Sequence, residues 1–248
     1  MRIGMLAPMP SELRPLVKRL GLRPAPAPAD GTGGAGRKVH EGRLGAAEVT
    51  AAMTGMGTAA AAEAARRLLD SQPVDHVVVV GIAGGIDDRL AIGDVIRPGV
   101  VIDGASGTEY RPHPLGETPD AAGDAPPYGA LHTSDEFIVD PDRVAALRER
   151  GVIALDMETA AVAAVCQDRG CPWSVVRAIS DRSSDGLADE AILGLAHPDG
   201  TANLPAVVRL ILRHPSRVPQ LARLGRDAKI ATDAAAAAAI DGCRRLLQ

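Results

Sequence analysis

Aromatic residues are almost absent from this chain of 248 residues, which has one Phe, one Trp and two Tyr. We therefore expect a core of Ala, Val, Leu and Ile, in which a single aromatic residue such as Phe137 is worth locating. The three cysteines, Cys166, Cys171 and Cys243, form no CxxC pair and no Cys/His spacing typical of a metal site. We expect no bound metal and a reducing, cytoplasmic setting.

The chain also lacks an excess of basic charge and a long hydrophobic run. Its 27 Lys and Arg residues stand against 31 Asp and Glu, a net charge of −4, so we expect no nucleic-acid partner. The longest apolar run, residues 77–80, has the length of a strand, and the residues before Pro8 are too few for a membrane span. The sequence therefore predicts no membrane span.

Segments with the pattern of strands and helices alternate along the chain. We expect strands at residues 2–7, 48–53, 76–82, 94–102, 131–138, 152–155 and 174–180. We expect helices at residues 11–20, 57–69, 140–150, 157–169, 204–213 and 218–247. Residues 22–37 and 104–128, rich in Gly and Pro, are expected to be loops. This alternation predicts an α/β fold with helices on both faces of a sheet.

Carboxylates follow three of the predicted strands, at the end where open α/β sheets form their sites. Glu12 follows the first strand, Asp156 and Glu158 follow the sixth, and Asp181 follows the last. Each also has an ordinary structural interpretation, as a turn or helix cap or as a first-turn acid facing the helix dipole. A glycine cluster at 81–85 ends the Val run, but the common nucleotide-phosphate loops are absent. The pattern alone indicates an α/β enzyme with acid–base chemistry.

Five segments add a more specific pattern. They are MRIGMLAPMPSEL at the start, TGMG at 54–57, VVVVGIAGGIDDRLAIGDVI from residue 77, LDMETA at 155–160 and VRAISD at 176–181. In this order they resemble the nucleoside phosphorylase/nucleosidase superfamily, most of all its methylthioadenosine/S-adenosylhomocysteine nucleosidase branch. The resemblance covers about residues 1–182, and the last two motifs are the most specific.

The resemblance implies a single three-layer α/β/α domain over residues 1–248, with a central mixed sheet. It implies a purine nucleoside N-ribosyl hydrolase that needs no cofactor and releases adenine from a 5′-substituted adenosine. It also implies a homo-oligomer, at least a dimer, for which the loop 104–128 is a candidate contact. The expected partner is a small-molecule nucleoside.

The resemblance also assigns catalytic roles. Asp181 would donate a proton to N7 of the purine as the base leaves, which requires a raised pKa. Glu12 would hold and deprotonate the attacking water, with Arg177 helping to orient it. Glu158 would bridge the ribose hydroxyls, assisted by the backbone of Met157.

The remaining expected binding residues surround the base and the 5′ group. Phe137 lies where the family stacks the purine ring, although plain core packing remains an alternative. The Ile138 backbone would read the base edge, and Met9 would lie near the 5′ substituent. Ser180 and Gly84 are the last two residues that we expect to contact the substrate.

The chain departs from the family pattern at Ile82, where the family often has Ser, and at Asp156, where it commonly has Glu. Residues 200–248 are similar instead to the tail of the hopanoid-associated phosphorylase-like proteins. A bulky 5′ group such as that of adenosylhopane is therefore an alternative to a methylthio or homocysteinyl group.

Two further alternatives concern the reaction. A nucleoside phosphorylase would use phosphate instead of water, but Glu12 at the first strand end would repel phosphate, which needs cationic or backbone donors. A nucleoside-binding protein without turnover would not need Glu12, Glu158, Arg177 and Asp181 together. We therefore favour the hydrolase.

Overall fold

The computed structural model describes residues 1–25, 39–116, 129–185, 209 and 213–248. Within these residues, eleven strands form one sheet. The strands are β1 Arg2–Ala7, β2 Arg23–Pro24, β3 Val39–Leu44, β4 Ala47–Met53, β5 His76–Gly85, β6 Val95–Ile96, β7 Val100–Asp103, β8 Glu109–Tyr110, β9 Ala130–Thr133, β10 Val152–Asp156 and β11 Trp173–Arg182.

The sheet is mixed, and β5 is its central strand. β1 runs parallel to β4 and to the first half of β5, whereas β11 runs parallel to β5 along nearly its whole length. The far end of β5 pairs antiparallel with β10, and β10, β9 and β7 are parallel to one another. The carboxyl ends of β1, β5, β10 and β11 therefore lie near one another, which is where an open sheet places its site.

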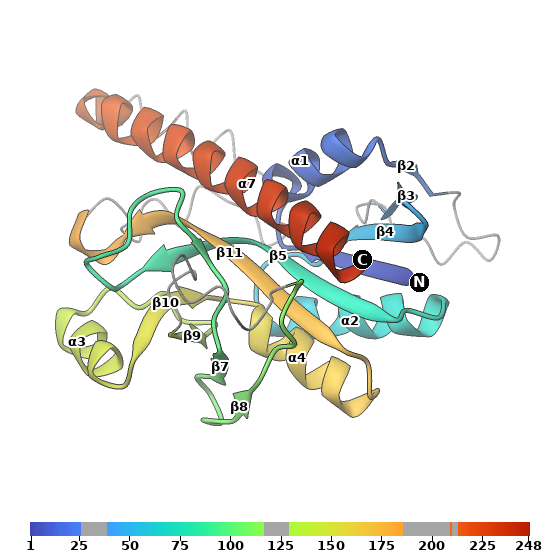
Figure 1. Cartoon of the computed structure of the whole chain (residues 1–248). Helices are drawn as coiled ribbons and strands as arrows, with labels where there is room; N and C mark the ends of the chain where they lie inside the picture. The colour runs from blue at the N-terminus through green and yellow to red at the C-terminus, as the bar shows by residue number, and fades with distance from the viewer. Residues whose placement is uncertain (26–38, 117–128, 186–208, 210–212) are drawn as a thin grey trace.

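Helices cover both faces of this sheet (Figure 1). α1 (Pro10–Leu20) and α7 (Val218–Leu246) pack against one face, where their apolar residues share a core with β1, β4, β5 and β11. α2 (Thr58–Ser71) and α4 (Thr159–Asp168) pack against the other face. α3 (Pro141–Glu149) lies against β10 in a smaller cluster. The predicted three layers, α/β/α with a mixed sheet, are confirmed.

The core follows from the composition. Residues 77–80 are all Val, and each is at most 1 % exposed because β5 has neighbours on both sides and helices on both faces. α2 and α4 meet the sheet largely through Ala and Val, whose small side chains allow close packing between helix and strand. Aliphatic residues thus form the core almost alone.

Several predicted boundaries were wrong. The strand expected at 131–138 ends at Thr133, and the strand expected at 94–102 is two short strands, β6 and β7. β3 was not predicted, and β8 lies inside an expected loop. The helix expected at 218–247 is α7, whereas the one expected at 204–213 falls almost wholly outside the described residues.

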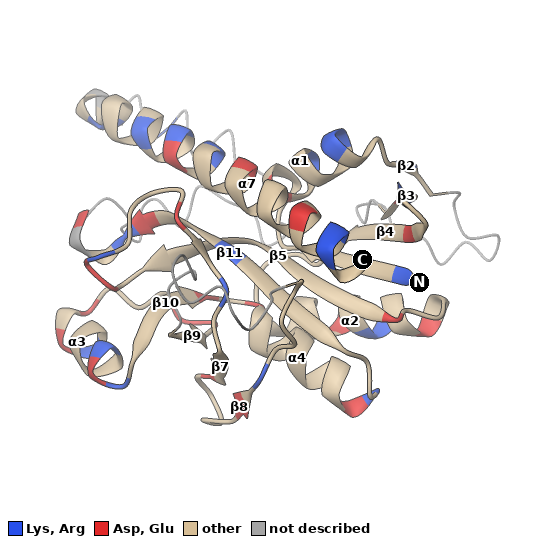
Figure 2. Cartoon of the chain, viewed as in Figure 1, with Lys and Arg blue, Asp and Glu red and all other residues tan. Residues whose placement is uncertain are grey.

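Charged residues lie mainly outside the sheet. Figure 2 shows charges of both signs along α7 and over the peripheral loops, while the central strand β5 carries no Lys, Arg, Asp or Glu. None of the helices in the described part of the chain combines the length and the apolar character needed to cross a membrane.

Candidate active site

A cavity of about 460 Å³ lies at the carboxyl ends of β1, β5, β10 and β11. Nine of the ten residues predicted for the site line it. They are Met9, Glu12, Gly84, Phe137, Ile138, Met157, Glu158, Ser180 and Asp181. The tenth, Arg177, is fully buried behind the lining and faces Glu12 and Glu158. Residues from five separate stretches of the chain therefore converge on one space.

Glu12 is held in place by two backbone N–H groups. It lies in the first turn of α1, where its carboxylate accepts from the N–H of Met9 at 2.9 Å and from that of Ile82 at 2.8 Å. Burial raises the pKa of Glu12 to about 7, although Arg177 and the two N–H groups oppose the rise. A carboxyl with such a pKa can exchange a proton near neutrality. Ile82 offers no side-chain hydroxyl, but its backbone supplies one of the two donors.

Arg177, on β11, is the counter-ion of the buried acids. Its Nη2 atom lies 2.5 Å from Oδ2 of Asp156 and 3.5 Å from Oε2 of Glu158, and its Nη1 atom lies 3.9 Å from Oε1 of Glu12. A Cβ atom at Gly81 would come within 2.3 Å of both Nη1 and the Glu12 oxygen. Glycine at position 81 is therefore what lets these two side chains meet.

Asp156, the last residue of β10, anchors this arginine and also accepts hydrogen bonds from the first residue of α4. Its Oδ1 atom accepts from the hydroxyl of Thr133 at 2.6 Å, and its Oδ2 atom accepts from the backbone N–H of Thr159 at 3.2 Å and from the Thr159 hydroxyl. The capping interpretation of Asp156 thus holds for its side chain, although the N-cap position of α4 is Glu158. The shorter carboxylate, where the family pattern commonly has Glu, still reaches Arg177.

Glu158 shares the same buried cluster. Its Oε1 atom accepts from the N–H of Gly57 at 3.0 Å, at the start of α2. Burial raises its pKa, with Arg177 acting in the opposite direction. Since one guanidinium faces three buried carboxylates, we expect the cluster to retain protons at neutral pH. Among the described residues, no group of His, Cys, Asp and Glu forms a metal site.

Asp181 enters the cavity because β11 contains an irregularity. The register between β11 and β5 shifts between Ile179 and Asp181, which leaves Ser180 as the extra residue of a bulge and pairs Asp181 with Gly84. A Cβ atom at Gly84 would lie 3.3 Å from the Asp181 carboxyl, so glycine leaves room beside it. Burial raises the pKa of Asp181, against a 2.6 Å hydrogen bond donated by the Ser180 hydroxyl.

Phe137 lies on the cavity wall and is not part of the core. Its side chain is 38 % exposed, whereas its neighbour Ile138 is 7 % exposed and packs with α3. The core-packing alternative for Phe137 therefore does not fit, and an exposed ring at a cavity mouth suits a flat ligand. This segment follows β9 without continuing it, which explains why the predicted strand is too long.

α7 packs on the sheet and also supplies part of the cavity wall. Leu224 and Ala228 line the cavity. The helix is tied to the end of β11 through Asp185, which accepts from Arg182 at 2.8 Å and faces Arg223 at 3.4 Å. The wall is therefore fixed by ion pairs next to Asp181.

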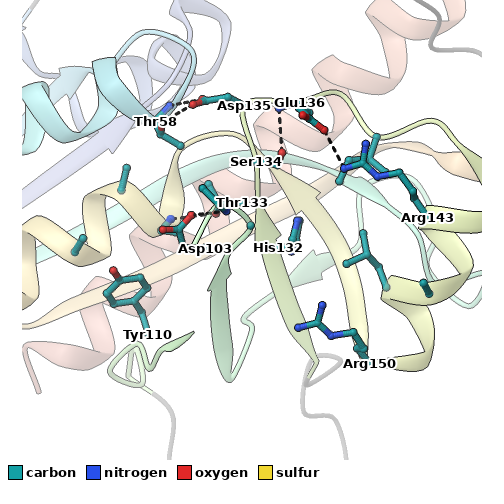
Figure 3. A pocket seen from close by; sticks show the side chains of 18 residues that line it. Thr58, Asp103, Tyr110, His132, Thr133, Ser134, Asp135, Glu136, Arg143 and Arg150 are labelled. Carbon is teal, nitrogen blue, oxygen red and sulfur yellow. Dashed lines mark hydrogen bonds and ion pairs between the residues drawn. The ribbon is translucent and has the colours of Figure 1, made fainter. Parts of the chain in front are cut away.

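A second cavity, of about 650 Å³, lies beyond the segment that follows β9 (Figure 3). It is larger, but its polar side chains bond mainly to one another: Glu136 pairs with Arg143 at 2.9 Å, and Asp135 accepts from Thr58. None of the predicted catalytic carboxylates reaches it. The smaller cavity is therefore the candidate active site.

Four residues of the site's framework were not predicted as such. Gly57 and Gly81 act through a backbone donor and through the lack of a side chain, and Thr133 and Thr159 act through buried hydroxyls. Gly57, Gly81 and Thr159 lie within the motif segments, whereas Thr133 lies in none of them and had no signal in the sequence. Their roles depend on contacts between segments far apart in the chain.

Comparisons with known proteins identify the family. The model of the Phosphorylase superfamily matches residues 2–128 and 121–213. The 5′-methylthioadenosine/S-adenosylhomocysteine nucleosidase of Shewanella piezotolerans is 30 % identical over 219 residues, covering 78 % of this chain and 93 % of that protein.

Two solved structures share the fold. The 5′-methylthioadenosine/S-adenosylhomocysteine nucleosidase of Colwellia psychrerythraea in complex with adenine has a TM-score of 0.70 and 22 % identity, covering 99 % of this chain and 96 % of that one. The futalosine hydrolase of Helicobacter pylori has a TM-score of 0.71 and 19 % identity, covering 100 % and 97 %. From the family model and the curated relative together, we conclude that the chain belongs to the phosphorylase superfamily.

Proposed function

We propose that this protein hydrolyses the N-glycosidic bond of a 5′-substituted adenosine of the methylthioadenosine/S-adenosylhomocysteine type. The C1′–N9 bond breaks, a bond from C1′ to a water oxygen forms, and adenine leaves. The observation that carries the proposal is the placement of two acids, the buried Glu12 and the half-buried Asp181, on one cavity. The same cavity is lined by Glu158, a carboxylate that can accept hydrogen bonds from the ribose hydroxyls. The nucleosidase relatives support the reaction type.

Asp181 acts as the general acid. Its burial favours the protonated form, so that it can donate its proton to N7 of the purine while electrons flow from the breaking bond into the base. The Ser180 hydroxyl holds Oδ1, which leaves Oδ2 toward the open space beside Gly84. Phe137 stacks on the purine, and the backbone of Ile138 reads its edge.

Glu12 acts as the general base. It accepts one proton from the attacking water, whose oxygen then bonds to C1′. The two backbone donors fix its carboxylate, and the Nη1 atom of Arg177 lies on the same side as Oε1. Glu158 and the Met157 backbone hold the ribose hydroxyls, and Met9 lies beside the 5′ group.

Water is favoured over phosphate because the cavity offers no uncommitted cation in the described part of the chain. Arg182, the one basic residue on its lining, pairs with Asp185, and Arg177 behind the lining already faces three carboxylates. Phosphate carries nearly two negative charges and needs such a partner. Near Glu12 and Glu158 it would instead meet two acids, and their ionisation beside phosphate would bring like charges together.

The test is product analysis with purified protein. Methylthioadenosine, S-adenosylhomocysteine, 5′-deoxyadenosine and adenosine are each incubated with and without phosphate, and free base and sugar are identified by mass spectrometry. Adenine release without phosphate supports the proposal. Formation of a ribose 1-phosphate product only when phosphate is present would assign a phosphorylase instead.

Asp181→Asn tests the acid directly, and we expect it to lower kcat by about 10²–10⁴-fold. The matched control is Asp75→Asn, because Asp75 is 60 % exposed and pairs with the amino terminus, away from the cavity lining. Binding of nucleosides by a wild-type protein that releases no base would favour the non-catalytic alternative.

The 5′ substituent and the assembly are also proposals. Leu224 and Ala228 make part of the wall apolar, which suits a thioether and is compatible with a bulkier group such as that of adenosylhopane. We further propose a cytoplasmic homodimer. Light scattering of the purified protein checks its mass, and a monomer at working concentration would refute the dimer.

A further inference from the structure

The hydroxyl of Thr159, the first residue of α4, lies where the buried charges of the site meet. It contacts Oδ2 of Asp156, and Arg177 approaches it with Nη2 at 2.9 Å and Nε at 3.3 Å. Thr159 is fully buried. No role for this residue follows from the motifs in the sequence.

The direction of its hydrogen bonds is fixed by chemistry. A carboxylate only accepts and a guanidinium only donates, so the single hydroxyl hydrogen goes to Asp156 and the oxygen lone pairs face Arg177. The side chain is β-branched at the start of a helix, which restricts its χ1 rotation. The hydroxyl is therefore a rigid acceptor for one edge of the guanidinium.

This arrangement decides which way Arg177 faces. Its Nε and Nη2 atoms are held on the side of Thr159 and Asp156. Its Nη1 atom is buried, has no hydrogen-bond partner within the described residues, and lies 3.9 Å from Glu12. A buried donor without a partner calls for a ligand, and a water or a substrate hydroxyl at this place would satisfy it.

We propose that Thr159 is a positioning residue for hydrolysis, whose hydroxyl fixes the rotation of the Arg177 guanidinium so that Nη1 stays beside Glu12. The inference rests on the proposed hydrolase function, since it assigns to Nη1 the orientation of the nucleophile. Thr159 itself does not touch the substrate, because it does not line the cavity.

Asp156 accepts hydrogen bonds from donors other than the Thr159 hydroxyl. Removal of that hydroxyl should therefore affect the position of Arg177 more than the folding of the chain. The Thr133 hydroxyl donates to Oδ1 at 2.6 Å, the Thr159 backbone N–H donates to Oδ2, and Arg177 itself reaches Oδ2. Thr133 lies on the lining of the second cavity (Figure 3). Loss of the Thr159 hydroxyl thus leaves the carboxylate paired but frees one edge of the guanidinium.

The first test compares Thr159→Val with Thr159→Ser. Valine keeps the branched shape and removes the hydroxyl, so we expect kcat for methylthioadenosine to fall about 10- to 100-fold with KM changed less than about threefold. Serine keeps the hydroxyl and should restore kcat to within about threefold of the wild type. The matched control is Thr232→Val, a buried threonine of α7 whose hydroxyl donates to the carbonyl of Lys229.

The pH profile gives a second kinetic readout. Arg177 lowers the pKa of Glu12, so a guanidinium that turns away should let that pKa rise. The acid limb of kcat/KM should then move to higher pH in Thr159→Val by about half a unit or more, and stay in place in Thr232→Val. The proposal would be overturned if Thr159→Val had the kcat of the wild type and an acid limb of kcat/KM at the same pH. It would also be overturned if Thr159→Ser failed to restore activity.

A stability measurement keeps the proposal testable if the wild type turns over none of the four nucleosides. Ionisation of Glu12 costs stability as pH rises through its raised pKa, and a further rise of that pKa extends the cost to higher pH. The loss of stability in Thr159→Val relative to the wild type should therefore grow between about pH 6 and about pH 8. A loss independent of pH, as expected for Thr232→Val, would make Thr159 merely structural whatever the reaction is.

Discussion

The Oε1 atom of Glu12 lies 3.9 Å from the Nη1 atom of Arg177, and both side chains are buried. They come from α1 and β11, and they meet above the backbone of β5 at Gly81. The pair joins the proposed base, Glu12, to Arg177, the cation that faces the buried carboxylates. Its geometry depends on Gly81, which has no side chain to separate the two groups.

We predict that Gly81→Ala abolishes most of the activity. The new Cβ would lie 2.3 Å from Nη1 of Arg177 and from Oε1 of Glu12, so the two side chains must move apart. We expect kcat/KM for methylthioadenosine to fall by about 10²-fold or more, the scale of losing a general base. Gly99→Ala is the control, because nothing lies within 4 Å of a Cβ built there. Equal activity of the two variants would mean that the Glu12–Arg177 contact does not matter.

The pH dependence of the reaction should be bell-shaped. Glu12 must be ionised to act as a base, and its pKa of about 7 predicts that kcat/KM rises as pH increases through that value. Asp181 must be protonated, so kcat/KM should fall as pH rises through the pKa of Asp181, which burial raises. Rates measured in buffers of constant ionic strength check both limbs. Glu12→Gln should lack the acid limb, and a wild-type profile that is flat around neutrality would contradict the assignment.

Glu12 should also make the folded state less stable as pH rises. The pKa of Glu12 is about 7 in the folded protein and 4.5 in a model peptide. Its favourable contribution to the free energy of unfolding is therefore complete below about pH 4.5 and lost by about pH 7. This shift corresponds to about 3 kcal/mol. Relative to the wild type, Glu12→Gln should therefore gain stability between acid and neutral pH, measured by urea unfolding. One of the two backbone N–H groups loses its acceptor in Glu12→Gln, and this loss lowers the stability of the variant by the same amount at every pH.

His76, the first residue of β5, should make the folded state less stable as pH falls, which is the opposite of the effect of Glu12. The ring is 4 % exposed, and its Nε2 atom lies 2.8 Å from the hydroxyl oxygen of Ser174, which donates to the carbonyl of His113. Nε2 must then donate, so this nitrogen carries a proton. Burial lowers the pKa of His76 to about 4 from 6.5, and protonation of the unfolded chain therefore costs the native protein stability as pH falls through this range.

We predict that His76→Gln weakens this acid sensitivity and leaves kcat unchanged near neutral pH, since residue 76 is remote from the cavity lining. Unfolding by urea at about pH 7 and about pH 5 gives the comparison with the wild type. The same loss of stability in both proteins on acidification would contradict the prediction.

The fold was predictable where composition and pattern agree. The buried Val run of β5, the helix caps at Asp140 and the long Ala-rich α7 follow from local rules of burial, capping and propensity. β3 was not predicted because its alternation of polar and apolar residues is weak. Its pairing with β4 depends on the turn at Gly45, whose φ is +58°.

The candidate site was predictable as a set of acids but not as a network. Asp181 and Glu158 stand in recognisable motifs, yet the bulge at Ser180 that turns Asp181 inward arises only when β11 pairs with β5. The hydroxyls of Thr133 and Thr159 matter because β9 and α4 bring them to Asp156. No local rule specifies contacts of this kind, since they depend on how distant segments pack.

Ala228, on the α7 wall, gives a test of how the cavity selects its ligand. We predict that Ala228→Leu, which fills part of the space, lowers kcat/KM for S-adenosylhomocysteine at least about tenfold more than for adenosine, because overpacking penalises the larger ligand. Binding of free adenine, measured by calorimetry, should stay within about threefold of the wild type. Ala222→Leu is the matched control, on an exposed position of the same helix. Equal losses for both nucleosides would instead indicate that this wall contacts the base or the ribose, and not the 5′ group.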